Sequence, residues 1–188
     1  MRSYGLSIDP GMSNGVCLFS WGGEQDEYFK QEAVWQFPHG APGLARFLTW
    51  QKVRVTVSRE LMMGSVPLTR MVVEKFTPRG DGEFSLTQKS VEPLRGEGVL
   101  IGRGFEPFID WAQPSQQYFM GNSALPLKEK KRLSREFLKL HGLYLTGSMV
   151  GQPDADDAIS AQLHAIAWLR RKRHMPTMVE LFGPGDDE

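Results

Sequence analysis

The first part of the chain contains short apolar runs separated by turn residues, a pattern that predicts strands. Residues 4–9 are predicted to form a buried strand ended by the Pro-Gly pair that follows, and 15–20 the returning strand of a hairpin. A third strand is expected over 28–35. The short, continuous apolar segment 71–74 is predicted to be a further strand, and it ends in an acid.

Apolar residues at helical spacing predict helices in the rest of the chain. One such pattern starts near Leu44 and continues to Met63, although the β-branched run 53–57 also favours a strand. Pro93 either kinks the next helix or marks its start. The predicted helices are 43–63, a stretch within 86–102, 127–141 and 154–173, with a short strand at 108–111. A hairpin followed by alternating strands and helices predicts an α/β fold with a mixed sheet.

The composition is that of one soluble domain. The chain has 188 residues, 40% of them hydrophobic, which is enough for one core. We expect a single domain over 1–176 and a flexible tail over 177–188. Cys17 is the single cysteine, which excludes an intramolecular disulfide and fits a reducing compartment. No apolar run approaches the ~20 residues needed to cross a bilayer, and no signal-peptide pattern opens the chain, so we expect a cytoplasmic protein.

Two acids stand at the ends of predicted buried strands. Asp9 ends the first strand, at the edge where α/β sheets place their sites, and burying its carboxylate is costly unless it is paired or binds a metal. Glu74 ends the continuous apolar strand, where a glutamate is rarely expected. The alternatives are a turn in which Asp9 accepts backbone hydrogen bonds, and a solvated strand end at which Glu74 pairs with Lys75.

Two further acids begin the last predicted helix. Asp154 and Asp157 are three positions apart and therefore project from one face, whereas Asp156 is turned by ~160° and is expected to face solvent. The same pattern is nearly a capping box, and acids in a first turn suit the helix dipole. Taken alone, this segment favours the capping interpretation, which is compatible with metal binding.

The conjunction of four acids favours a metal site. Carboxylate clusters suit Mg²⁺ or Mn²⁺, and two such ions ~4 Å apart serve phosphodiester hydrolysis. The chain lacks a thiolate pair or HExxH pattern for zinc, a GxxxxGK[ST] phosphate loop and a GxSxG nucleophile turn. The candidate catalytic and metal-binding residues are Asp9, Glu74, Asp154 and Asp157.

These acids lie in three motifs that resemble those of the RuvC Holliday-junction resolvases, members of the RNase H-like superfamily. The segment 5–11 followed by Asn14-Gly15 resembles the opening motif of that family, and 72–74 resembles its second acidic strand. The segment 154–161 resembles its C-terminal motif of two acids three apart in an alanine-rich helix. The first motif is shared in related form by sugar-kinase-like ATPases, but the order and approximate spacing of all three match over nearly the whole chain.

The resemblance implies an RNase H-like fold, with a mixed five-stranded sheet flanked by helices. It also implies a homodimer that uses two Mg²⁺ ions per active site, with Mn²⁺ as a substitute, to nick four-way junctions symmetrically. The divergent sequence resembles a bacteriophage member more than a cellular one, which implies the host cytoplasm. The segment 94–98 loosely resembles the family's glycine-bearing helix beside the DNA, and Phe76 its base-stacking aromatic. The segment 36–70 departs from the cellular enzymes.

A basic stripe on the predicted helix 127–141 is a second indication of DNA binding. The formal net charge is zero, which counts against a nucleic-acid binder unless acids at the site offset a basic face. The cations of this helix fall within a ~100° stripe opposite an apolar face that includes Leu140, with Glu129 and Glu136 off the stripe. An ordinary solvated helix face is the alternative. The candidate DNA-binding residues are Lys128, Lys131, Arg132 and Arg135 on this helix, and Lys75, Phe76, Arg79 and Arg95 near the acids.

Three alternatives to a junction resolvase stay open. They are a fork or flap nuclease with little junction preference, an ATP-binding kinase-like protein on the same core, and a non-catalytic DNA-binding module. The kinase-like alternative requires a second glycine hairpin and a longer chain, and four acids have no use beside phosphates in an inactive module. His164 is expected to face the sheet or solvent without a metal partner.

Overall fold

A five-stranded mixed sheet forms the centre of the molecule, as seen in a computed structural model that describes residues 2–22, 28–76, 88–112, 127–140 and 160–167. Three strands form an antiparallel meander, and two more continue the sheet in parallel beyond the first strand. The order across the sheet is β3-β2-β1-β7-β8. The strands are β1 (Arg2–Asp9), β2 (Asn14–Gly22), β3 (Tyr28–Phe37), β7 (Arg70–Glu74) and β8 (Ile109–Ala112).

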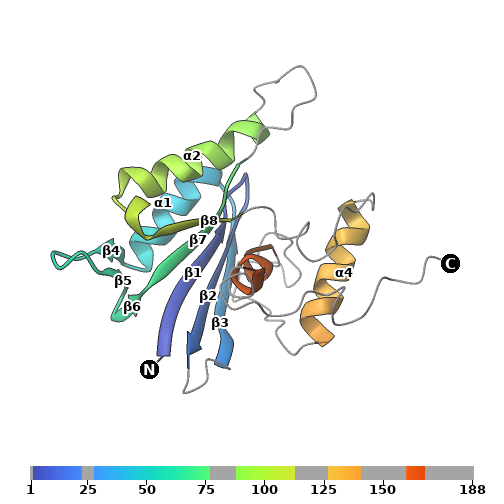
Figure 1. Cartoon of the computed structure of the whole chain (residues 1–188). Helices are drawn as coiled ribbons and strands as arrows, with labels where there is room; N and C mark the ends of the chain where they lie inside the picture. Colours follow the sequence, from blue (N-terminus) through green and yellow to red (C-terminus); the bar gives the residue numbers. More distant parts are fainter. Residues whose placement is uncertain (1, 23–27, 77–87, 113–126, 141–159, 168–188) are drawn as a thin grey trace.

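Helices cover both faces of this sheet. Helices α1 and α2 lie against one face, and the helical segment 160–167 lies against the other, with α4 further out on the same side (Figure 1). The predicted mixed five-stranded sheet flanked by helices is therefore confirmed. The helices are α1 (Gly40–Trp50), α2 (Gln88–Gly102), the short 3-10 helix η1 (Glu106–Phe108) and α4 (Leu127–Leu140).

The segment predicted to be one helix over 43–63 instead contains the end of α1 and a small second sheet. Helix α1 ends at Trp50, and Lys52 adopts a left-handed backbone conformation with a φ of 53°, which no α-helix continues. A three-stranded antiparallel meander follows, so the β-branched composition of 53–57 prevails over the helical spacing. Its strands are β4 (Val53–Val55), β5 (Leu61–Met63) and β6 (Val66–Leu68).

The other predicted helices differ less from the observed ones. Helix α2 begins before Pro93, which lies inside it, and α4 has the predicted extent to within one residue. On α4 the predicted apolar face is wrong at Leu140, which is 71% exposed, while Leu138 is buried. The helix predicted over 154–173 is described only over 160–167. The tail predicted over 177–188 lies outside the described residues, and among those described no helix is long and apolar enough to span a membrane.

The central hairpin contributes side chains to two separate cores, one on each face of the sheet. Leu6 and Ile8 are fully buried and pack in the core beneath α1 and α2. On the opposite face, a second core joins Phe19 and Trp21 to the small residues Ala161 and Ala165 of the segment 160–167. Strand β2 therefore contributes to both sides of the sheet, with Val16 and Leu18 in the first core and Phe19 and Trp21 in the second.

Gly5 faces the second core at a point where no side chain fits. A Cβ added there would lie 2.6 Å from Cζ of Phe19, and this ring is fully buried and stacks on Trp21 with centroids 5.3 Å apart. The aromatic pair therefore occupies the space that any other residue at position 5 would need.

We expect Gly5→Ala to lower the free energy of unfolding by about 1–3 kcal/mol, because it overpacks a buried aromatic pair. Gly98→Ala is the matched control: no heavy atom lies within 4 Å of a Cβ added on this exposed face of α2. That substitution should raise stability by roughly 0.5–1 kcal/mol, because alanine suits a helix interior better than glycine. Urea unfolding monitored by circular dichroism measures the free energy of unfolding of both variants. A Gly5→Ala variant as stable as the unaltered protein would show that the aromatic pair is not packed on Gly5.

Candidate metal centre

Parallel pairing of β1 and β7 brings Asp9 and Glu74 to the same edge of the sheet. In this ladder Ile8 is opposite Val73, so the acids that follow these residues leave adjacent strands side by side. Side chains alternate between faces along a strand. Because Ile8 and Val73 face α1 and α2, both carboxylates belong to the other face, the one that the segment 160–167 covers.

His164 reaches this edge from the covering segment. Its side chain is 1% exposed, and its Nε2 lies 2.5 Å from Oε2 of Glu74. Ala161 and Ala165, both fully buried, allow the segment to approach the sheet closely, and His164 lies on the same side of the helix as Ala161. The second ring nitrogen, Nδ1, is buried and has no hydrogen-bond partner within the described part of the chain.

Asp9, Glu74 and His164 form the candidate metal centre. Each offers one ligand atom, and these atoms all lie within 4.8 Å of one another. The two acids are half-buried, so their mutual repulsion is less screened than at the surface. Carboxylate oxygens and an imidazole nitrogen are suitable ligands for a divalent cation such as Mn²⁺, while Mg²⁺ favours the oxygens. The donors therefore fit a divalent cation at this edge.

Of the four acids proposed from the sequence, the structure brings two together. Asp154 and Asp157 lie outside the described residues. His164 was not among the proposed ligands: it faces the sheet, one of the two expected alternatives, but the expectation that it has no metal partner is wrong, since Asp9 and Glu74 lie beside it. One signal in the sequence could have pointed to it: seven positions after Asp157, two helical turns on, His164 shares a face with that acid on the predicted helix.

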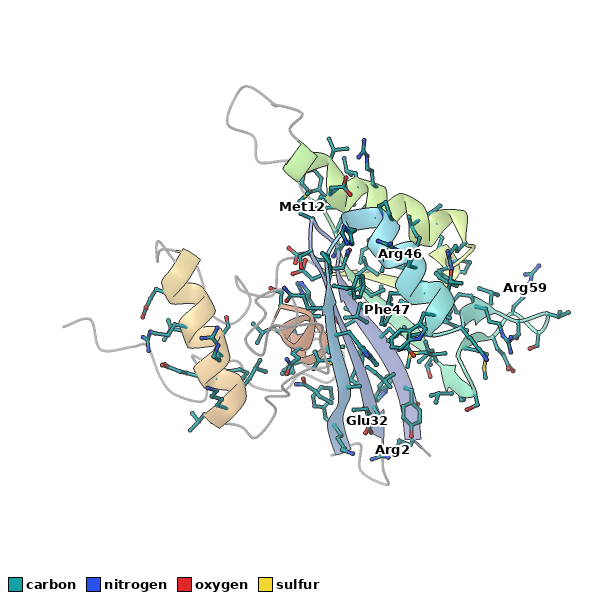
Figure 2. All side chains as sticks on the ribbon, turned by 180° about the vertical axis from the view of Figure 1, so that it is seen from behind. Arg2, Met12, Glu32, Arg46, Phe47 and Arg59 are labelled. Carbon is teal, nitrogen blue, oxygen red and sulfur yellow. The ribbon has the colours of Figure 1, made fainter. Side chains whose placement is uncertain are left out.

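The turn that follows Asp9 is tied to α1 and α2 by backbone and side-chain hydrogen bonds. Met12 lies at the tip of the β1–β2 hairpin, beside the start of α1, and its carbonyl accepts a hydrogen bond from the amide of Gly40 (Figure 2). Asn14 Nδ2 donates to the Gly40 carbonyl at 2.8 Å. Buried Glu92 of α2 accepts from the Ala41 amide at 3.1 Å, a bond that holds the pKa of this carboxyl below its usual range.

Three of the residues predicted to contact DNA lie on the described segments near the acids. Lys75 is exposed and Phe76 is half-buried, directly after Glu74. Arg95 donates to Oε1 of Glu92 at 2.8 Å, yet its side chain is 60% exposed, so the rest of its guanidinium stays accessible to a phosphate. Arg79 lies outside the described residues.

The basic stripe predicted on α4 is partly neutralised. Arg132 donates to Glu129 and also to Glu136, the latter at 2.6 Å, so the two acids beside the stripe neutralise this cation. Their carboxylates raise the pKa of the Arg132 guanidinium. Arg135 is partly buried, and the side chains of Lys128 and Lys131 are not among those described.

The mixed sheet with an acidic cluster at the carboxyl ends of β1 and β7 is an RNase H-like architecture. Among solved structures it is similar to Thermus thermophilus RuvC in complex with Holliday junction substrate, with a TM-score of 0.50 at 13% identity, covering 90% of this chain and 96% of that one. A second structure of RuvC from Thermus thermophilus gives a TM-score of 0.48 at 14% identity, covering 92% and 97%. No protein-family model and no curated protein matches the chain. The first likeness establishes that this chain has the fold of RuvC.

We expect Asp9→Asn and Glu74→Gln each to weaken Mn²⁺ binding by roughly tenfold or more, because each removes a charged oxygen ligand. Isothermal titration calorimetry measures the affinity. Asp110→Asn is the control: this acid of β8 belongs to the same sheet and lies 4.0 Å from Arg70, outside the cluster. Equal Mn²⁺ affinity in all three variants would contradict a cation site at Asp9 and Glu74.

Proposed function

We propose that the protein is a divalent-metal-dependent DNA endonuclease that resolves Holliday junctions or related branched DNA. The observation that carries this proposal is the juxtaposition of Asp9, Glu74 and His164 at the carboxyl edge of a RuvC-type sheet. Sites in open α/β sheets lie at this edge. A fold alone hosts many functions, so the argument rests on the donor set at this position and on the motifs that supply it.

Each residue of the cluster has a separate part in this proposal. Asp9 and Glu74 anchor the cation, and Asp154 and Asp157, which precede His164 by ten and seven positions in the sequence, complete the ligand set. Bound divalent metals supply Lewis-acid stabilisation of the phosphate and a water of lowered pKa. His164 either contributes Nε2 as a ligand or orients the Glu74 carboxylate by hydrogen bonding, and both roles fix the position of that carboxylate. Mg²⁺, with two ions per site, is the proposed physiological metal.

Three observations support a branched DNA substrate. The structure of similar fold is in complex with Holliday junction substrate. Lys75 presents an exposed cation directly after Glu74, Arg95 on α2 has a side chain that is 60% exposed, and Arg79 follows Lys75 by four positions in the sequence. Phe76 supplies an aromatic ring two residues after Glu74 that can stack on an unpaired base. Two symmetric nicks in a four-way junction require two active sites, which is the reason to propose a homodimer.

We expect Asp9→Asn or Glu74→Gln to abolish cleavage while binding to a four-way junction persists, because the phosphate contacts are made by other residues. Cleavage of four-way, three-way, flap and linear duplex DNA by the unaltered protein and both variants, with Mg²⁺ and with EDTA, tests this. Asp110→Asn again serves as the control and should cleave as the unaltered protein does.

The substrate panel separates the proposed function from its alternatives. Selective cleavage of the four-way junction supports a resolvase. Equal cleavage of the four-way, three-way and flap substrates identifies a fork or flap nuclease. If linear duplex is cleaved equally as well, the protein is a nuclease that does not select for DNA structure. Junction binding without cleavage under any metal would identify a non-catalytic binding module.

We expect Lys131→Ala to lower junction affinity and to reduce the slope of log K against log salt by about 1, as for one lost phosphate contact. Arg132→Ala should reduce the slope less, because Glu129 and Glu136 already neutralise that guanidinium. The triple replacement of Lys131, Arg132 and Arg135 by Ala should combine these losses. Fluorescence anisotropy with a labelled junction across a salt series measures the slopes, and an unchanged slope in the triple variant would show that α4 does not face the DNA.

A further inference from the structure

Helix α2 contacts the backbone just after each of the two acids of the candidate metal centre. Gly96 packs on the turn after Asp9: a Cβ added at Gly96 would lie 2.8 Å from Cβ of Pro10. One residue further along the helix, Glu97 Oε1 accepts a hydrogen bond from the backbone amide of Phe76, with 2.8 Å between the two atoms. One turn of α2 therefore touches the residue after Asp9 and the second residue after Glu74.

The Phe76 amide is the point where regular sheet pairing ends. The amide of Lys75 still donates to the carbonyl of Ala112 on β8, at 2.8 Å. The amide of Phe76 donates to the side chain of Glu97 and not to a neighbouring strand. A backbone amide that is partly shielded from water loses free energy if it lacks a partner. The Glu97 carboxylate therefore determines the direction in which the chain leaves β7.

Glu97 acts on the cluster through the backbone, because its own carboxylate is outside it. Among the described residues, the group able to bind a cation consists of Asp9, Glu74 and His164. Glu97 is half-buried, and the hydrogen bond that it accepts is charge-assisted, which makes it stronger than a neutral one. Mutation of a residue that hydrogen-bonds to a metal ligand typically lowers metal affinity by roughly 10–100-fold, and Glu97 acts one step further out, through the backbone that follows Glu74.

We propose that Glu97 is a positioning residue: by holding the Phe76 amide, it fixes the Glu74 carboxylate relative to Asp9 and fixes where Phe76 is presented. The part that concerns Phe76 and DNA rests on the proposed function. The part that concerns Glu74 requires only that the cluster binds a divalent cation.

The test compares Glu97→Ala, Glu97→Gln and Glu106→Ala with the unaltered chain. Glutamine keeps an oxygen that accepts the Phe76 hydrogen bond but removes the charge, whereas alanine removes both. Glu106 is an exposed acid of the short helix after α2, and its replacement controls for a change of net charge. Two quantities are measured on each folded protein: the Mn²⁺ affinity by calorimetry, and the exchange rate of the Phe76 amide hydrogen by NMR.

In Glu97→Ala we expect the Phe76 amide to exchange at least tenfold faster and Mn²⁺ affinity to fall by roughly tenfold. In Glu97→Gln both quantities should change less than in Glu97→Ala, because glutamine keeps an acceptor oxygen but not its charge, and in Glu106→Ala they should not change. Unchanged Mn²⁺ affinity in Glu97→Ala, or an equal loss in Glu97→Gln, would overturn the proposal, the latter because charge and not the hydrogen bond would then be responsible.

Failure of the proposed function gives a different result. Mn²⁺ affinities that follow the expected order, in a protein that cleaves no DNA, would support Glu97 as a positioning residue and contradict the nuclease. Absence of Mn²⁺ binding in the unaltered chain would contradict both the metal centre and the part of Glu97 in it, even if the Phe76 amide responded.

Discussion

Two carboxylates emerge side by side from the parallel ladder between β1 and β7, and their repulsion is the constraint that the surrounding structure has to satisfy. Their ligand oxygens lie within 4.8 Å of one another, and like charges at this range repel more strongly in a half-buried site than at the surface. A cation between Asp9 and Glu74, or a positively charged partner, removes that cost. His164, whose Nε2 lies 2.5 Å from Oε2 of Glu74, lies where it can share in binding such a cation. The arrangement therefore favours a bound cation on electrostatic grounds.

Small residues allow the covering elements to approach this edge. Ala161 and Ala165 permit the segment 160–167 to lie close on the sheet, so that His164 reaches Glu74. Gly96 permits α2 to pack on Pro10 from the other face, and the neighbouring Glu97 takes the first amide beyond the sheet ladder. Elements on both faces of the sheet thus help to position the acids. The segment 160–167 does so through the side chain of His164, and α2 does so through its contacts with the backbone after Asp9 and after Glu74.

How far the sequence predicts this structure depends on how local each signal is. Apolar runs and turn residues, which are local patterns, predict the hairpin of β1 and β2 and the strand that ends at Glu74. The proximity of Asp9 to Glu74 was inferred from the conjunction of the acids and from the motif resemblance, and the pairing of β1 with β7 brings the two together. The helix expected over 43–63 failed because apolar spacing is ambiguous where β-branched residues can pair with a later strand, as Val53–Val55 does with Leu61–Met63.

The contacts that the sequence did not reveal are tertiary. His164 has no neighbour in the sequence that identifies its partner, because Glu74 lies 90 positions away and only folding brings them together. The hydrogen bond from the Phe76 amide to Glu97 could not be predicted either, because every residue other than proline has a backbone amide and the sequence does not indicate which one a distant side chain will bind. On α4 the positions of Glu129 and Glu136 could be read from helical spacing, but the reach of Arg132 to both depends on side-chain conformation.

A crystal structure of the protein with Mn²⁺, with anomalous scattering measured at the manganese edge, tests the metal centre most directly. We expect an anomalous peak within coordination distance of carboxylate oxygens of both Asp9 and Glu74, on the side of the sheet that His164 covers. A fully occupied Mn²⁺ elsewhere, with Glu74 still bonded to His164 and no peak between the two acids, would contradict the central claim.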